Sequence, residues 1–254
     1  MSKTIAFINQ KGGTGKTTSA VNVGAGLSRL GKKTLAIDLD PQANLTYHLG
    51  IKTHELKPSV SEVMGGRAGI EEAIVERGGL DVIPANLGLA ETENRIFNMG
   101  GREYLLKEAL AGLKRAYAYI LVDCPPSLGV LTLNALVAVR EVYIPLEVQA
   151  LPLQGLRAIM KIVELVRERL NPGLELSGII ATKYDSRRNL DREVLETLKE
   201  HFGELVFKTA IRETIKLAEA PSYGQDIFNY APKSRGAEDY LALCREIVER
   251  RKRP

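Results

Sequence analysis

The 254-residue chain is poor in the residues that mark several classes of protein. It has no tryptophan and two cysteines, Cys124 and Cys244, which lie too far apart in the sequence for a disulfide framework or a CxxC metal site. The three histidines, His48, His54 and His201, have no spacing typical of metal ligands. No run approaches the ~18 apolar residues of a membrane span, and the N-terminus lacks the features of a secretory signal. These absences favour a cytoplasmic protein.

An excess of charge of one sign is also lacking. The 35 Lys and Arg residues against 31 Asp and Glu give a net charge of +4, which by itself does not indicate a nucleic-acid partner. A composition of 44% hydrophobic and 26% charged residues excludes a disordered or fibrous chain. No repeat and no Pro/Ser-rich linker divides the sequence, so we predict a single domain over residues 1–254.

Short apolar segments alternate with segments of helical periodicity. Residues 118–122 are continuously apolar, which is typical of a parallel strand covered by helices on both faces. We therefore expect an α/β fold with a doubly wound, mostly parallel sheet. The predicted strands are 4–9, 33–38, 80–84, 117–123, 141–146, 176–182 and, more weakly, 205–209. The predicted helices are 16–30, 101–114, 131–139, 153–170, 189–201 and 236–250, with surface helices and loops over 50–79.

A glycine-rich segment joins the first predicted strand to the first predicted helix. Its sequence is Gln-Lys-Gly-Gly-Thr-Gly-Lys-Thr-Thr over residues 10–18, in the strand–loop–helix order of a phosphate-binding loop. Glycines let the loop amides approach an anion, and the helix N-terminus adds partial positive charge. We assign Lys16 to the β- and γ-phosphates, Thr17 to Mg²⁺ and Thr18 to the α-phosphate. The predicted nucleotide-binding residues of the loop are Lys11, Gly12, Gly13, Thr14, Gly15, Lys16, Thr17 and Thr18.

The loop departs from the standard pattern at its start. Gln10 stands where that pattern has glycine, and Lys11 adds a second lysine. A second cation beside a phosphate site is repelled unless it meets phosphate charge, and one loop cannot easily use a lysine from each of its ends. Lys11 is therefore predicted to reach the nucleotide of another subunit; the alternative is a solvated surface lysine.

Acidic residues follow two predicted strands. Asp38 and Asp40 follow the second strand, and Asp123 ends the strand over 117–123. The carboxyl ends of parallel strands meet at the crevice where doubly wound sheets bind ligands. We expect Asp123 to bind Mg²⁺ through water, Asp38 to lie near the metal, and Asp40 to orient an attacking water. The alternative for each is a helix cap or a turn residue.

Five motifs together resemble a known family. KGGTGKTT, DLDPQAN and DCPPSLGVLTLNAL follow predicted strands, and LAEAPSYGQ and APKSRGAEDYLAL lie toward the end of the chain. They resemble the deviant Walker A P-loop ATPases and, more narrowly, the ParA/Soj-type chromosome and plasmid partitioning proteins, over nearly the whole chain. The first strand begins at residue 4, so we expect no N-terminal helix-turn-helix domain, as in the short chromosomal type.

The resemblance implies a Mg²⁺-dependent ATPase with weak basal activity. In that family ATP closes two subunits face to face, with Lys11 of each reaching the phosphates of the other. The ATP-bound homodimer binds double-stranded DNA without sequence preference, which implies a nucleoid-associated cytoplasmic protein. A ParB-like (Spo0J-like) centromere-binding partner stimulates hydrolysis and release. Carried over by position, the adenine contacts are Ile211 and Arg212, and the DNA contacts are Arg187 and Lys216, with Arg188 and Lys183 as neighbours.

Three other functions share parts of this pattern. A MinD-like membrane-cycling protein needs an amphipathic C-terminal helix with large apolar residues, whereas residues 240–254 have no Phe or Trp after Val248. An iron–sulfur carrier or nitrogenase-type reductase needs paired cysteines in a recognisable ligand pattern, which the sequence lacks. A nucleotide-gated scaffold without hydrolysis remains open if Asp40 is idle. No membrane partner is expected.

Overall fold

A seven-stranded sheet forms the centre of the computed structural model, which describes residues 2–52, 58–148 and 153–250. The strand order is β3-β4-β2-β5-β1-β6-β7, and every neighbouring pair is parallel except β3 and β4. The strands are β1 (Lys3–Phe7), β2 (Thr34–Asp38), β3 (Val75–Arg77), β4 (Leu80–Ile83), β5 (Tyr119–Asp123), β6 (Glu141–Glu147) and β7 (Glu175–Thr182). The predicted doubly wound parallel sheet is confirmed, whereas the single domain over residues 1–254 stays a prediction.

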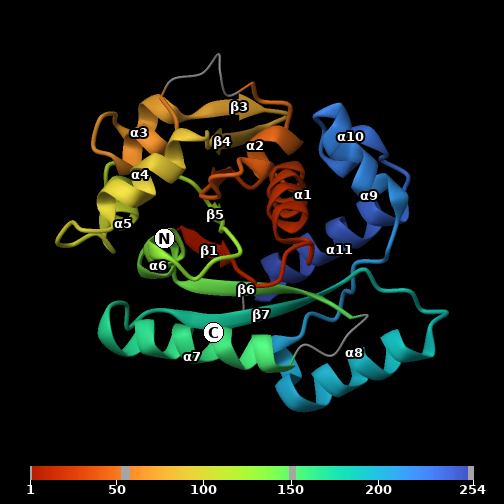
Figure 1. Ribbon diagram of the computed structural model, residues 1–254. Helices are drawn as coiled ribbons and strands as arrows, with labels where there is room; N and C mark the ends of the chain where they lie inside the picture. Colours follow the sequence, from red (N-terminus) through yellow and green to blue (C-terminus); the bar gives the residue numbers. More distant parts are fainter. Residues whose placement is uncertain (1, 53–57, 149–152, 251–254) are drawn as a thin grey trace.

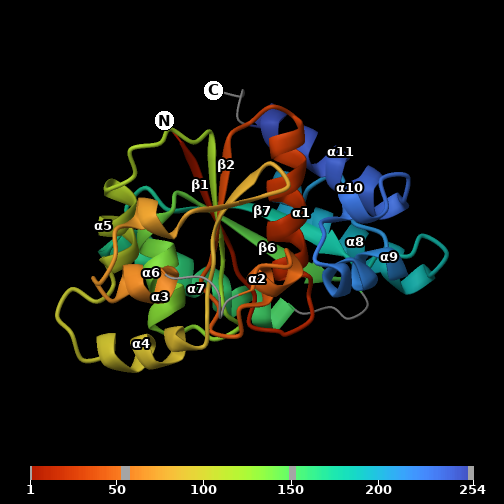
Figure 2. The same cartoon turned by 90° about the horizontal axis from the view of Figure 1, so that it is seen from above.

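Helices lie on both faces of this sheet (Figure 1). Helices α3 to α7 cover one face, and α1, α10 and α11 cover the other (Figure 2). The longer helices are α1 (Lys16–Arg29), α4 (Gly88–Ile96), α5 (Leu105–Ala111), α6 (Val130–Ala138), α7 (Leu153–Arg169), α8 (Asn189–Phe202) and α11 (Arg235–Arg250). The short ones are α2 (Asn44–His48), α3 (Val60–Met64), α9 (Ile215–Glu219) and α10 (Ile227–Tyr230), with 3₁₀ turns η1 (Ile70–Ala73), η2 (Gly203–Leu205) and η3 (Ala220–Tyr223).

The central strands are buried on both sides. All five residues of β5 are buried, and β1 divides its side chains between two apolar clusters. Ile5 and Phe7 point to the cluster under α1 and α11, while Ala6 points to the cluster under α3 to α7. Because neither face meets water, the apolar runs of these strands need no alternation with polar residues. This burial fixes the carboxyl ends of β1, β2 and β5 side by side.

The predicted strand over 205–209 is wrong. The segment begins as η2 and makes only a single bridge, Val206 to Ile179. The amides of Lys208 and Thr209 donate instead to the carboxylate of Glu246 on α11, at 2.9 and 3.1 Å. A side chain therefore takes the donors that a neighbouring strand would have used.

The region over 50–79 also differs from the expectation of surface helices and loops. Helix α3 is largely buried, with Val60, Val63 and Met64 in the core. Strand β3 pairs antiparallel with β4 through a turn at Gly78 and Gly79, both with positive φ, which is the backbone that a tight hairpin needs.

Two glycines bring distant segments into backbone contact. Gly50, after α2, and Gly224, after η3, both have positive φ, at 64° and 65°. A Cβ on Gly224 would lie 2.8 Å from the Cα of Gly50, so neither position has room for a side chain. The segment that follows the Asp40 loop is thus packed directly on the LAEAPSYGQ segment. Within the described residues, no helix has both the length and the apolar character needed to cross a membrane.

Candidate nucleotide site

The loop between β1 and α1 has the backbone that the glycine pattern predicts. Gly13 and Gly15 have φ of 74° and 85°, and α1 begins immediately at Lys16. A cavity of about 410 Å³ opens above the loop, a volume suited to a small-molecule ligand. Besides the loop, its walls include Asp40, residues 182–183 and residues 211–214. The amides at the start of α1 and the helix dipole favour an anion at this place.

Lys16 stands at the bottom of this cavity. It is 7% exposed, and its Nζ lies 3.4 Å from the carbonyl oxygen of Lys11, at the other end of the loop. Burial lowers the pKa of Lys16, while the nearby carboxylates of Asp123 and Asp40 raise it. A partly desolvated ammonium at the N-terminus of a helix is suited to bind phosphate.

Asp123 is fully buried at the end of β5, where it pairs in register with Asp38 of β2 and Phe7 of β1. Neither of its carboxylate oxygens has a hydrogen-bond partner of ordinary geometry among the described residues. Burial raises the pKa of Asp123 well above its usual range, Asp38 raises it further, and the Thr17 hydroxyl lowers it. A buried carboxylate without a partner is costly. The Asp123 and Thr17 oxygens are donors that Mg²⁺ prefers, so this pair fits the predicted metal.

Asp38 has a different environment. Its Oδ1 accepts the Asp40 amide at 3.1 Å, and its Oδ2 accepts the Thr46 amide at 2.9 Å and the Thr46 hydroxyl at 2.7 Å. Burial raises the pKa of Asp38 to about 6, although these hydrogen bonds lower it. Both oxygens are engaged with the loop that follows β2. Asp38 therefore positions that loop, and its assignment to the metal stays a prediction.

Asp40 lies in the wall of the cavity, as the sequence predicts for a residue that orients water. It is 5% exposed, and its Oδ1 accepts the amide of Gln42 at 2.9 Å. The turn continues through Ala43, a non-glycine residue with φ of 53°, whose amide donates to the Asp40 carbonyl at 2.8 Å. The tight turn holds Asp40 in the wall of the cavity, and its role toward water stays a prediction.

Lys11 points toward its own subunit in this structure. Its Nζ lies 2.9 Å from Oε2 of Glu147, the last residue of β6, and its side chain is 54% exposed. Oε1 of the same carboxylate is 3.3 Å from the Nζ of Lys183. The hydrogen bond from Lys11 lowers the pKa of Glu147, burial raises it, and the hydrogen bond from Lys183 lowers it further. Lys11 must leave Glu147 to reach another subunit.

Ile211 and Arg212 line the cavity, in the part of the wall expected at the adenine. The Ile211 amide donates to Ala181 of β7 at 2.8 Å, which ties this segment to the sheet. The guanidinium of Arg212 turns to α11, where it pairs with Asp239 at 2.7 Å and Glu238 at 3.1 Å. The backbone amide of Arg212 also donates to Asp239, at 2.9 Å, so both its guanidinium and its amide are engaged with α11. The adenine contact stays a prediction.

Three of the four predicted DNA contacts are exposed cations, each paired with a carboxylate. Arg187 binds Asp185 through two nitrogens, at 2.9 and 2.8 Å. Arg188 lies 3.2 Å from Glu213, and Lys216 lies 2.9 Å from Glu219. The fourth, Lys183, lies in the wall of the cavity instead. These pairs reduce the positive charge that the segment presents.

Sequence reasoning missed several residues of the site. Glu147 and Thr182 end strands β6 and β7, and Thr182 donates its hydroxyl to the Thr14 carbonyl at 2.9 Å. The rule that ligands bind at the carboxyl ends of parallel strands could have found both. Thr46 and Asp239 carry no such signal, because they reach the site through tertiary contacts from helices.

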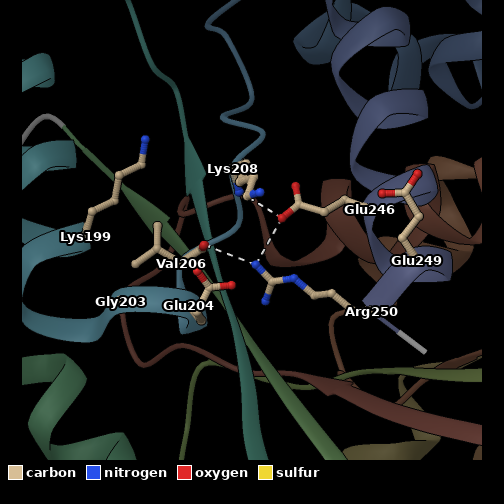
Figure 3. A pocket seen from close by; sticks show the side chains of 8 residues that line it. All are labelled: Lys199, Gly203, Glu204, Val206, Lys208, Glu246, Glu249 and Arg250. Carbon is tan, nitrogen blue, oxygen red and sulfur yellow. Dashed lines mark hydrogen bonds and ion pairs between the residues drawn. The ribbon is translucent and has the colours of Figure 1, made fainter. Parts of the chain in front are cut away.

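A second cavity, of about 350 Å³, lies between η2 and α11 (Figure 3). Its central groups bind each other and the backbone. Glu246 accepts the two amides of the 208–209 segment and pairs with Arg250 at 3.0 Å. Arg250 in turn donates to the Val206 carbonyl at 3.1 Å and lies over the ring of Phe207, at 3.9 Å. Glu246 and Arg250 thus connect α11 to the 206–209 segment, and we call this cluster the charged joint.

A glycine loop between a strand and a helix, with a lysine, a hydroxyl and a buried carboxylate beside it, defines a P-loop nucleotide-binding protein. The family described as AAA domain matches residues 2–176. The chain is 44% identical to the sporulation initiation inhibitor protein Soj of Bacillus subtilis, over 98% of this chain and 99% of that protein. It is 40% identical to the chromosome partitioning protein ParA of Caulobacter vibrioides, over 98% and 94%. The chain therefore belongs to the AAA domain family and, within it, to the ParA/Soj-type partitioning ATPases, as predicted.

Solved structures agree with this fold. A cobyrinic acid a,c-diamide synthase from Mycobacterium smegmatis, with bound ATP analogue and magnesium, superposes with a TM-score of 0.88 at 36% identity. The match covers 99% of this chain and 96% of that one. The same fold thus occurs in proteins with different names, so the fold alone does not define an activity.

Proposed function

We propose that this chain is a Mg²⁺-dependent ATPase that partitions DNA. Its ATP-bound dimer binds double-stranded DNA without sequence preference and leaves it when a ParB-like partner stimulates hydrolysis. The observation that carries the nucleotide part is the fully buried carboxylate of Asp123 beside Thr17 and Lys16, which has no hydrogen-bond partner of ordinary geometry among the described residues. The partitioning part is supported by the Soj and ParA relatives, which the chain matches over almost its full length.

The residues divide the chemistry between binding and hydrolysis. The loop amides and Lys16 bind the phosphates, and Thr17 and Asp123 would hold Mg²⁺, Asp123 through water. When bound, Mg²⁺ neutralises charge on the β- and γ-phosphates during transfer. Asp40 orients the attacking water from the wall of the cavity. The turn at Ala43 and the hydrogen bonds from Asp38 hold Asp40 in place.

The second subunit supplies Lys11. Its ammonium leaves Glu147 when two subunits meet across the nucleotide, and it then contacts the phosphates of the partner. A cation that completes a phosphoryl-transfer site across an interface acts as an arginine finger does, with effects of roughly 10³–10⁵ on rate. Basal hydrolysis by the monomer is accordingly slow, and the dimer is the active form.

Binding to DNA follows from dimerisation. Arg187, Arg188 and Lys216 exchange their intramolecular carboxylates for DNA phosphates, which gives weak and salt-sensitive contacts, with Kd on the order of 10⁻⁴–10⁻⁶ M for a single unit. A dimer doubles the contacts, so ATP raises affinity through valency. Such a protein resides on the nucleoid in the cytoplasm.

Co-sedimentation with non-specific DNA and with anionic liposomes, each with ATP, ADP or no nucleotide, tests this function. We expect ATP-dependent sedimentation with DNA that Lys16→Ala abolishes. Asp40→Ala should keep ATP-dependent DNA binding and lose turnover. Arg187→Glu should still dimerise with ATP and fail on DNA, whereas Lys199→Glu, an equal charge reversal at an exposed residue of α8, should bind normally.

Each arm has an outcome that contradicts the proposal. Sedimentation with liposomes but not with DNA would favour a MinD-like membrane cycle. Loss of DNA binding in Asp40→Ala would refute the role of Asp40 in hydrolysis alone. Normal DNA binding by Arg187→Glu would remove this segment from the DNA interface. Rapid turnover by a monomer would exclude the role of Lys11 across the interface.

A further inference from the structure

Lys183, the residue after β7, has an uncommon backbone conformation. Its φ is 53°, and among the described residues only Lys183 and Ala43 are non-glycine residues with positive φ. A lysine in the left-handed region is strained and persists only where its surroundings hold it. Ala43 belongs to the Asp40 turn. Strain of this kind concentrates at ligand sites, so the second instance needs an explanation of its own.

Hydrogen bonds on both sides fix this turn. Before it, the Thr182 hydroxyl donates to the Thr14 carbonyl of the phosphate loop at 2.9 Å, and the Thr182 carbonyl accepts the Val148 amide at 3.3 Å. After it, the Tyr184 amide donates to the Ile211 carbonyl at 3.0 Å. The chain is therefore anchored to the loop, to the end of β6 and to the opposite wall, and Lys183 lies between these anchors.

The side chain of Lys183 extends over the phosphate loop. Its Nζ lies 4.0 Å from the position that a Cβ on Gly13 would occupy, and the residue lines the nucleotide cavity. The same Nζ is 3.3 Å from Glu147. Strands β6 and β7 are paired up to Glu147 and Thr182, so this carboxylate and this ammonium come from adjacent strand ends.

The charges at this rim do not balance. Glu147 supplies one negative charge to two ammonium groups, those of Lys11 and Lys183, at 2.9 and 3.3 Å. One positive charge is thus in excess beside a loop that already presents Lys16 and its amides. An ammonium has three donors, so Lys183 can keep its bond to Glu147 and still donate to a second oxygen. A phosphate group supplies the negative charge that would balance this excess, and its oxygens accept hydrogen bonds from an ammonium.

We propose that Lys183 binds the terminal phosphate of the nucleotide in its own subunit and makes the site prefer a nucleoside triphosphate over a diphosphate. Glu147 holds Lys183 over the loop and releases Lys11, which is the more exposed of the two lysines. The inference rests on the proposed function, because it requires that the loop bind a nucleotide. It moves Lys183 from the predicted DNA contacts to the nucleotide.

Isothermal titration calorimetry with Mg·ATP and Mg·ADP tests this role in the full chain. Lys183→Met should weaken ATP binding at least about tenfold, as expected for a lost charge-assisted hydrogen bond, and change ADP binding less than about twofold. Lys183→Arg should keep the preference for ATP. The matched control is Lys199→Met, which removes an exposed lysine of α8 and should match the wild type for both nucleotides.

Lys183→Gly separates charge from backbone strain. Glycine accepts positive φ freely, so this variant should melt at a temperature equal to or above that of Lys183→Met while losing the same ATP preference. Equal losses for ATP and ADP in Lys183→Met would refute the proposal, as would wild-type affinity for both. Weakened DNA sedimentation with unchanged ATP affinity would return Lys183 to the DNA contacts.

The same titrations distinguish failure of the proposed function from failure of the inference about Lys183. If the wild type binds neither nucleotide, the function and the inference both fall. If the wild type binds both and Lys16→Ala binds neither, the nucleotide site stands, and the Lys183 variants alone decide the inference.

Discussion

The nucleotide cavity and the cavity at the charged joint of Figure 3 are similar in size and differ in how their charges are satisfied. In the joint, Glu246 and Arg250 pair with each other and accept or donate backbone hydrogen bonds. At the nucleotide cavity Lys16 is partly desolvated, and the oxygens of the fully buried Asp123 beside it have no partner of ordinary geometry in the part of the chain that the structure describes. Charge alone therefore does not mark a ligand site. What distinguishes the nucleotide site is a buried carboxylate without a partner of ordinary geometry beside a partly desolvated ammonium.

Substitution of Asp123 should give the largest effect. Asp123→Asn removes the charge and keeps the shape, so hydrolysis of ATP should fall by about 10³-fold, as when a preorganised charged group is lost from a transition state. The nucleotide-free protein should become more stable, because burial disfavours the carboxylate. Single-turnover kinetics and thermal melting measure the two effects.

Asp123→Asn is thus expected to slow ATP hydrolysis and to raise the stability of the nucleotide-free protein. A lower melting temperature in nucleotide-free Asp123→Asn would mean that the carboxylate has a stabilising partner in solution. The charged groups of the nucleotide site would then be paired, as those of the charged joint are. Asp239→Asn is a comparison variant, since Asp239 is bound by the amide and guanidinium of Arg212 and should lose stability on substitution.

His48 extends the comparison to α2, the helix after the Asp40 loop. Its Nε2 has no partner within residues 2–52, 58–148 and 153–250, and burial lowers the pKa of His48 from 6.5 to about 4, opposed by a hydrogen bond to the backbone of Gln225. The unfolded chain therefore binds a proton at higher pH than the folded one. The stability that depends on neutral His48 is fully present above pH 6.5 and is lost as the pH falls toward 4, by up to about 3 kcal/mol of the free energy of unfolding.

Denaturant unfolding of the wild type and of His48→Gln at several pH values measures this. The variant should lack the part of the acid slope between pH 6.5 and 4 that His48 contributes. If the free energy of unfolding depends on pH in the same way for both proteins, the imidazole is charged or solvated in the folded state. His48 would then not be a buried group without a partner.

The smallest effect is expected in the charged joint. Glu246→Gln weakens the bonds to the 208–209 amides and to Arg250 and should destabilise the protein by about 1–2 kcal/mol, which lowers the melting temperature by roughly 2–4 °C per kcal/mol. ATP turnover should not change. Lys199→Met, in the wall of the same cavity, should alter stability by less than about 0.5 kcal/mol. A change in turnover in either variant would connect the joint to the nucleotide site.

Most of the fold was predictable because its signals are local. The apolar run of β5 and the helical period of α1 are written in adjacent residues, and both elements form within two residues of the predicted bounds. The segment over 205–209 was not predictable, because Glu246, about 40 positions later, binds the amides that a strand would have used. Tertiary hydrogen bonds override local patterns in such places.

The site divides in the same way. Lys16, Thr17 and Asp123 come together because the carboxyl ends of β1 and β5 are neighbours, which alternating strands and helices predict. The contact of Lys11 with Glu147 could not be read from the sequence, because it depends on the β1–β6 pairing and on a rotamer. Nor could the left-handed backbone of Lys183, since lysine rarely adopts it.

The contact between Gly50 and Gly224 has a mechanical consequence. Gly50 follows the turn that holds Asp40 and α2, and Gly224 follows the helices next to the 211–214 wall. The two backbones leave no room for a side chain between them, so an alanine at either glycine would push the two segments apart. The turn that holds Asp40 would then lose its packing against the segment that follows the 211–214 wall.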